Sequence, residues 1–419
     1  MSPCLDHGTE TPRTQESACP TINFAHVANS HLEENQLASR PMRLGIPLER
    51  APHERRVAAV PASVKVFTGW GWDVQLETGA GKAAGFPDAA YEDAGATIVP
   101  DGAAAHNADL ILRVERPTFD EIMLVPEGAV LAGFLDPFVA IDVVRALADR
   151  NITALAVEAV PRTTLAQAMD ALSSQANVAG YAAVMLAAAE SPKFPSMLVT
   201  AAGTIPPARS LVLGVGVAGL QAIATFRRLG AIVHAYDIRP ETKEQVESLG
   251  AKFVEAPTQE MDEGGYAKEV DAETAAKQQE VLAEFVAKSD LVVTTAQIPG
   301  RPAPRLINAD VVASMHPGSV IVDMAASSGG NVEGSLPDEV VDLNGVRILG
   351  PIDLPSRVAT DASRMYARNL QELVGRWRTE DSLTVNLDDD VSGPATITSG
   401  GKIINPRTRA AMGLEEEAT

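Results

Sequence analysis

Short apolar runs alternate with helical segments in the N-terminal half of the chain. The apolar runs predict strands at 42–47, 73–77, 96–99, 109–114, 129–134 and 152–159, with an early helix at 63–69. Strands that alternate with helices are typical of βαβ units, whose parallel strands share one sheet. This half of the chain is therefore predicted to form an α/β domain.

The same alternation begins again after residue 189. One or two helices are expected over 161–189, and the later elements are strands at 210–213, 232–236, 291–295, 319–324 and 346–350, helices at 217–229, 240–249, 281–287 and 362–378, and a hairpin around Gly400 and Gly401. We predict an α/β fold with two Rossmann-like doubly wound domains, the second inserted into the first, and a cleft between them.

The domain boundaries follow from where the pattern stops and restarts. Residues 1–40 are polar and lack any hydrophobic period, which predicts a disordered N-terminal extension. The first domain is expected at 41–172 and 357–419, and the second, nucleotide-binding domain at 173–356.

Composition narrows the possible partners. The 419 residues include 34 Lys and Arg against 55 Asp and Glu, a formal net charge of -21, which disfavours binding to nucleic acid or to an anionic lipid surface. The two cysteines, Cys4 and Cys19, offer neither a disulfide framework nor a metal site to the body of the chain. With no secretory signal and no apolar run of about 20 residues, we expect a cytoplasmic protein without direct membrane insertion.

A glycine-rich loop follows the strand at 210–213. Gly214-Val215-Gly216-Val217-Ala218-Gly219 has the spacing G-x-G-x-x-G, with an alanine-rich helix after it. In such a loop the first glycine permits a tight turn, the second admits a pyrophosphate and the third allows close helix–strand packing. The loop therefore predicts a dinucleotide site, although a turn that serves only packing has the same spacing.

An acidic residue ends the next predicted strand. Asp237 is followed by Ile238 and Arg239, and a carboxylate there can accept hydrogen bonds from ribose hydroxyls while repelling a 2′-phosphate. Arg239 is the competing signal, because an arginine nearby can bind the NADP phosphate. We favour NAD(H).

Gln297 lies where the strand at 291–295 runs into a proline–glycine turn. Ligands of doubly wound sheets gather beyond the carboxyl ends of the strands, so we expect Gln297 near the nucleotide. An ordinary strand end is the alternative interpretation.

A polar segment joins the two predicted domains. As a helix, residues 162–175 would place Gln167, Asp170 and Ser174 on one face with Ser173 beside them, and Leu165, Met169 and Leu172 on another. Such a stripe is also typical of a solvated surface. Its position between two domains favours a site for a carboxamide and a ribose.

These motifs resemble one family. Arg162–Tyr181, Ala201–Arg209 and the Gly214 loop are similar to the soluble NAD(H)-binding component of proton-translocating nicotinamide nucleotide transhydrogenase. Gly264–Glu269 resembles that family's mobile loop, and Pro351–Ser363 its return segment between domains. The similarity spans about residues 42–400.

The resemblance implies direct hydride transfer between NADH bound here and NADP+ on a partner, coupled to proton movement. It implies that Arg162, Gln167, Asp170 and Ser173 orient the nicotinamide and that Tyr266 closes over the nucleotide. The implied contacts with the cofactor also include Thr163, Thr164, Gly265 and Gln278. The implied partners are an NADP(H)-binding β subunit, a membrane-spanning subunit that holds the chain at the inner membrane, and a second copy in a homodimer.

Two other hypotheses stay open. Met42–Val60 is also similar to alanine dehydrogenase, whose N-terminal domain needs a lysine and a histidine for the chemistry of an amino acid. The matching positions here are Arg113 and Asp136, which lack the titratable histidine and argue against that activity. The other hypothesis is a non-catalytic NAD-binding module.

Overall fold

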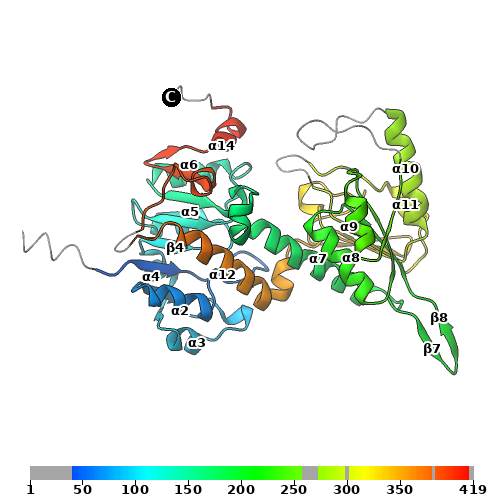
Figure 1. The fold of residues 1–419 in the computed structure, drawn as a ribbon, viewed down its shortest axis with the longest axis horizontal. Coiled ribbons are helices and arrows are strands. Elements are labelled where there is room, and N and C mark those ends of the chain that lie inside the picture. The colour runs from blue at the N-terminus through cyan, green and yellow to red at the C-terminus, as the bar shows by residue number, and fades with distance from the viewer. Residues whose placement is uncertain (1–39, 257–271, 298–301, 380–382, 415–419) are drawn as a thin grey trace, which may run out of the picture. The chain divides into compact units, whose positions relative to one another are not determined.

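The computed structural model describes residues 40–256, 272–297, 302–379 and 383–414 (Figure 1). The predicted extension 1–40 lies outside these ranges except for its last residue. The segment Gly264–Glu269, with Gly265 and Tyr266, lies outside the described residues as well. Residues from Met42 onward form one unit.

The first sheet contains eight strands within the described residues, in the order β17-β16-β6-β5-β4-β1-β2-β3. Their bounds are β1 Arg43–Ile46, β2 Asp73–Glu77, β3 Thr97–Val99, β4 Leu110–Leu112, β5 Val130–Gly133, β6 Thr153–Ala156, β16 Thr396–Ser399 and β17 Lys402–Ile403. From β6 to β3 every pair is parallel, whereas β16 runs antiparallel to both β6 and β17. The chain thus returns to its first sheet after building the second.

The second sheet has seven described strands in the order β11-β10-β9-β12-β13-β15-β14. Their bounds are β9 Arg209–Leu213, β10 Ile232–Tyr236, β11 Lys252–Phe253, β12 Leu291–Thr294, β13 Val320–Asp323, β14 Val340–Leu343 and β15 Val346–Leu349. Among these seven, β14 alone is antiparallel to its neighbour. The strand order reverses between β9 and β12, and the carboxyl ends of the strands at such a reversal are where ligands bind.

The helices connect these strands. Their bounds are α2 Pro61–Gly69, α3 Asp88–Asp93, α4 Gly102–His106, α5 Phe119–Leu124, α6 Ile141–Asp149, α7 Ala171–Glu190, α8 Val217–Arg228, α9 Thr242–Ser248, α10 Ala272–Ala287, α11 Ala309–Ala313, α12 Ala359–Gly375, α13 Ser392–Ala395 and α14 Pro406–Ala411, and the 3-10 turns are η1 Lys82–Ala84, η2 Val157–Ala159, η3 Thr164–Met169, η4 Ala326–Ser328 and η5 Leu354–Val358. Within the described ranges, no helix combines the length and apolarity that a membrane crossing requires.

The predicted α/β fold class is confirmed, and several elements differ in detail. The helix expected at 281–287 begins at Ala272, and the strands β11 and β14 were not predicted. The strand expected at 152–159 ends at Ala156 and turns into η2. A two-stranded hairpin, β7 (Leu198–Thr200) and β8 (Gly203–Ile205), was not predicted. The hairpin expected around Gly400 and Gly401 is present as β16 and β17.

Helix α7 belongs to two hydrophobic cores. Its first residue, Ala171, packs in the core of the first sheet, whereas Ala179, Ala183 and Ala187 pack in a core of the second. The contact with α8 is very close: a Cβ built on Gly180 would lie 2.1 Å from the carbonyl oxygen of Ala218. Only glycine allows this approach, so α7 lies directly against the start of α8.

Gly180→Ala is therefore expected to push α7 away from α8 and to lower stability by about 1–3 kcal/mol, the usual cost of an added methyl in a packed interior. The thermal unfolding midpoint measures this. Gly69→Ala is the matched control, because a Cβ there would meet no atom within 4 Å. Equal midpoints for Gly180→Ala and the wild type would contradict the close contact.

Candidate functional site

The glycine loop between β9 and α8 has the geometry of a dinucleotide turn. Gly214 has φ 97°, a region that favours glycine, and its N–H donates to the Tyr236 carbonyl at 2.8 Å. A Cβ on Gly219 would lie 2.0 Å from the Gly214 carbonyl oxygen, whereas one on Gly216 would meet nothing within 4 Å. The first and third glycines are thus required by the fold, and the second faces open space.

That open space lies at the N-terminus of α8. Gly216 is the N-cap and supplies no side-chain cap, and Val217 and Ala218 form the first turn. The first amides of a helix lack partners within the helix and carry the positive end of its dipole, which suits a phosphate. The loop therefore fits the pyrophosphate of a dinucleotide.

Asp237 follows β10 directly and is buried beside this loop. One carboxylate oxygen accepts the Val215 N–H at 2.7 Å, and the other accepts both the backbone N–H and the Nε of Arg239 at 2.9 Å. Burial alone would raise the pKa of Asp237, but these hydrogen bonds and the charge of Arg239 lower it below its ordinary value. Asp237 is thus a carboxylate at neutral pH, able only to accept hydrogen bonds.

Arg239 is held by the same carboxylate. Its Nη2 also donates to Asp237 at 3.1 Å, and its side chain is 39% exposed. A 2′-phosphate would have to replace this ion pair and approach the buried carboxylate. Ile238 lies between the two, half-buried at the strand exit.

The end of β12 closes the other side of the loop. Thr295 donates its hydroxyl to the Gly214 carbonyl at 3.0 Å. The buried Asn331 accepts from the Ala296 N–H at 3.1 Å and donates back to the Ala296 carbonyl at 2.9 Å. Gln297 is exposed, and its amide donates to the Met324 carbonyl at 3.1 Å.

Sequence reasoning missed Thr295 and Asn331. Thr295 lies two residues before Gln297, and its position at the same strand end was the available signal. Asn331 follows the pair Gly329 and Gly330, both with positive φ, and no spacing rule connects it to the loop.

One or two helices were expected over 161–189, but the polar segment 162–175 is not continuous, as a shared helical face requires: it contains the 3-10 turn η3 and the start of α7. The 3-10 turn η3 ends at Met169. Asp170, with ψ 82°, is not helical and separates this turn from α7, which begins at Ala171. Gln167 and Ser174 consequently do not share a helical face: Gln167 is exposed, whereas the Ser174 hydroxyl donates to Asn369 at 2.6 Å. The prediction that Leu165 shares a buried apolar face with Met169 is wrong as well, because Leu165 is 57% exposed.

The break arises because Asp170 caps α7. Its carboxylate accepts the Ser173 N–H at 2.8 Å and the Ser173 hydroxyl at 2.6 Å, the usual arrangement of an aspartate N-cap. Arg162, Thr163 and Thr164 precede the cap and are exposed, as Gln167 is. The turn therefore presents donors and acceptors outward.

The structure thus gathers the predicted residues at two places. The glycine loop, Asp237 and Gln297 lie at the carboxyl ends of β9, β10 and β12. The η3 turn lies at the start of α7. Since a helix rises about 1.5 Å per residue, Gly180 and its contact with α8 lie about 15 Å along α7 from the Asp170 cap. Gln278 lies on α10, and its approach to the nucleotide stays a prediction.

The two positions matched to alanine dehydrogenase lie in different surroundings. Arg113 is buried, pairs with Glu121 at 3.0 Å and Glu49 at 3.4 Å, and donates to Nε2 of His106 at 3.1 Å. Burial and the Arg113 charge lower the pKa of His106, against the opposing hydrogen bond to the Gly102 carbonyl. Asp136 is exposed and pairs with Arg116 at 2.6 Å.

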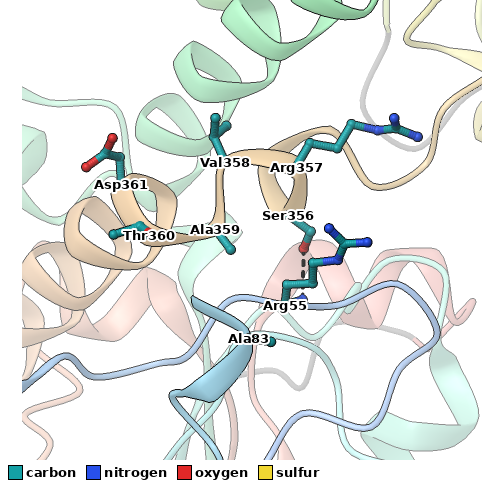
Figure 2. Close-up of a pocket in the computed structure, with 8 residues that line it drawn as sticks. All are labelled: Arg55, Ala83, Ser356, Arg357, Val358, Ala359, Thr360 and Asp361. Carbon is teal, nitrogen blue, oxygen red and sulfur yellow. Dashed lines mark hydrogen bonds between the residues drawn. The ribbon is translucent and has the colours of Figure 1, made fainter. Parts of the chain in front are cut away.

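Two pockets lie away from both places. One, of about 340 Å³, is lined by η5 and the start of α12, where the Arg55 N–H donates to Ser356 (Figure 2). Another, of about 620 Å³, is lined by Tyr181 and Met185 of α7 among others. Neither is lined by the glycine loop or by η3. No group of three His, Cys, Asp or Glu side chains in the described ranges could hold a metal ion.

Comparison with known proteins places the chain in a family. Residues 45–179 match the family described as "Alanine dehydrogenase/PNT, N-terminal domain", and residues 183–406 match its C-terminal domain. A relative in Rhodospirillum rubrum, named as the first portion of a divided NAD(P) transhydrogenase subunit alpha, is 47% identical over 377 residues, with 87% of this chain and 98% of that one covered. The NAD(P) transhydrogenase subunit alpha of Haemophilus influenzae is 44% identical over 372 residues, which are 87% of this chain and 72% of that one.

Solved structures agree. A transhydrogenase structure from Sinorhizobium meliloti matches with a TM-score of 0.80 and 45% identity, over 86% of this chain and all of that one. An L-alanine dehydrogenase matches with a TM-score of 0.74 and 25% identity, over 89% of this chain and 99% of that one. The chain therefore belongs to the alanine dehydrogenase/PNT family and is a homologue of the NAD(P) transhydrogenase α subunits.

Proposed function

We propose that this chain is the NAD(H)-binding component of a proton-translocating NAD(P) transhydrogenase, in which hydride passes directly between NADH held here and NADP+ on a partner subunit. The observation that carries the proposal is the exposed η3 turn. Its polar side chains face outward at one end of α7, and the same helix contacts the dinucleotide turn through Gly180. A nicotinamide placed there is accessible to a second molecule.

Hydride transfer requires the protein mainly to position the two nicotinamides. Bound NADH supplies a hydride, and since its transfer to NADP+ releases no proton, no general acid or base is needed. The two reacting atoms must approach to about 3–3.5 Å with water excluded. On this proposal Gln167 and Arg162 orient the carboxamide, Thr163 and Thr164 flank it, and the Asp170–Ser173 pair binds the ribose. Gly265, Tyr266 and Gln278 are further proposed contacts with the nucleotide.

The partners follow from the same proposal. The relatives are named as one subunit, or a portion of one, of a larger enzyme. We propose an NADP(H)-binding β subunit and a membrane-spanning subunit that carries the proton, which together hold this chain at the cytoplasmic face of the inner membrane. The boundaries 41–172 with 357–419, and 173–356, stay our proposed domains; the return of β16 and β17 to the first sheet supports them.

We also propose a homodimer. The hairpin β7–β8 and the residues before it expose several large apolar side chains within a short segment: Phe194 (54%), Met197 (60%), Leu198 (39%), Val199 (67%) and Ile205 (41%). A patch of this kind is more common at interfaces than on free surfaces. Contact with a second copy would cover it.

Asp237 should determine which nucleotide binds more tightly. NADH should bind more tightly than NADPH. Asp237→Asn should lower the ratio of the NADPH to the NADH dissociation constant about tenfold or more, because it removes the carboxylate that repels a 2′-phosphate and pairs with Arg239. Titration of nucleotide fluorescence measures both affinities. Asp290→Asn is the control, because the Asp290 carboxylate accepts from the Lys193 Nζ at 2.9 Å and from the Arg209 backbone N–H at 2.8 Å. Tighter binding of NADPH by the wild type would contradict the assignment of Asp237.

Gln167 should affect hydride transfer more than NADH binding. Gln167→Asn should slow hydride transfer to an NADP-binding transhydrogenase subunit by about tenfold to a hundredfold, while NADH affinity changes little, because a small misplacement affects the reacting geometry first. Gln245→Asn on the exposed face of α9 is the matched control. Equal losses in binding and transfer would assign Gln167 to binding alone, and robust NADH formation from alanine and NAD+ would replace the proposed function by a dehydrogenase.

The β7–β8 hairpin should be part of the proposed dimer interface. Val199→Asp should shift the sedimentation coefficient toward that of a monomer, since a charge would be buried in the proposed interface. Val139→Asp is the control, because Val139 is 75% exposed and lies far from the hairpin in the sequence. A dimer that persists in Val199→Asp would remove the hairpin from the interface.

A further inference from the structure

The break between η3 and α7 leaves backbone groups that the helix itself does not pair. The Ala168 carbonyl lies just before the Asp170 cap and has no place in the hydrogen-bond ladder of α7. It accepts a hydrogen bond of 2.8 Å from the side-chain amide of Asn369. Asn369 lies in the middle of α12, far away in the sequence.

The same amide also holds the other side of the break. Since a carbonyl can only accept, the Asn369 nitrogen must face Ala168, and its oxygen then accepts the Ser174 hydroxyl at 2.6 Å. One amide group therefore connects the last turn of η3 with the first turn of α7, on either side of Asp170.

The next residue of α7 is held in the same way. Gln175 is buried, donates to the Ala362 carbonyl of α12 at 3.1 Å and accepts from Arg56 at 3.0 Å. Arg56 is itself paired with Glu54 and Glu115. Helix α12 thus fixes two successive side chains at the start of α7.

A buried asparagine in the middle of a helix lowers stability unless its amide is hydrogen-bonded. Asn lowers helix propensity in a helix interior, and a buried amide needs partners for both its groups. Asn369 is 8% exposed, among the apolar neighbours Ala367, Leu370 and Leu373. Ala166 and Met169 pack in this core through apolar contacts, which have no preferred direction. The two hydrogen bonds of Asn369 are directional and set the orientation of η3 relative to the start of α7.

We propose that Asn369 is a positioning residue for hydride transfer, which holds the η3 turn so that Gln167 and Arg162 meet the nicotinamide in the reactive orientation. This inference rests on the proposed function. Asn369 itself touches neither nucleotide: it acts through the Ala168 carbonyl and Ser174.

The test compares three variants of the full chain. Asn369→Leu removes both hydrogen bonds at similar volume, Asn369→Asp keeps the acceptor for Ser174 but loses the donor to Ala168, and Ser174→Ala removes the hydroxyl alone. Ser363→Ala is the matched control, since Ser363 is a fully buried residue of the same helix whose hydroxyl accepts the Val57 N–H at 3.0 Å, a backbone group outside η3 and α7.

Two readouts are used. Hydrogen–deuterium exchange of the amides 164–170 should speed up about tenfold or more in both Asn369 variants, less in Ser174→Ala, and not in Ser363→Ala. Hydride transfer to an NADP-binding transhydrogenase subunit should fall about tenfold to a hundredfold in the Asn369 variants, with NADH affinity, from fluorescence titration, changed less than about threefold.

Unchanged exchange in Asn369→Leu would overturn the inference, as would faster exchange with hydride transfer at the wild-type rate. Equal effects in Ser363→Ala would show a merely structural role and overturn it too. A wild-type chain that binds NADH and transfers no hydride would instead overturn the proposed function. Asn369 would then be judged by exchange and NADH affinity alone, so the two failures are distinguishable.

Discussion

The close contact between α7 and α8 is the constraint on which the rest of the structure depends. Because Gly180 lets the Ala218 carbonyl approach where a Cβ would stand, the helix that leaves the first core is locked to the helix that begins at the dinucleotide turn. Helix α7 thus sets the spacing between the polar η3 turn and the amides at the start of α8, which we propose bind the pyrophosphate. Neither group could be repositioned without separating two packed cores, which gives the site its geometry before any ligand binds.

Charge then decides what the site can accept. Asp237 is buried, ionised and bonded to both the glycine loop and Arg239, so the neighbouring cation is already paired. The selection for NAD(H) proposed here depends on that pairing as much as on the carboxylate itself. The exposed polar turn at the start of α7 contrasts with the closed, titratable pocket that amino-acid chemistry needs. Arg113 and Asp136 do not form such a pocket: one is enclosed in ion pairs and the other lies at the surface.

Local sequence signals predicted most of the strands, the glycine loop and Asp237, because hydrophobic period and glycine spacing act over a few residues. One or two helices were expected over 161–189, and the single polar face assigned to 162–175 is wrong, because the break at the Asp170 cap turns Gln167 and Ser174 apart. Asn369, about two hundred residues away, forms hydrogen bonds on both sides of that break. Thr295 and Asn331 were missed for the same reason: their partners come together only when separate strands meet. Long-range polar contacts of this kind leave no periodic trace in one sequence.

We expect hydride to leave a nicotinamide presented at the surface and to enter a nucleotide carried by another molecule, with no intermediate carrier. Isotope tracing tests it most directly: NADH deuterated at the transferred C4 position is mixed with this chain, an NADP-binding transhydrogenase subunit and NADP+, and the products are analysed by mass spectrometry. We expect the deuterium to appear in NADPH without dilution by solvent protons. Deuterium found in water would contradict direct transfer.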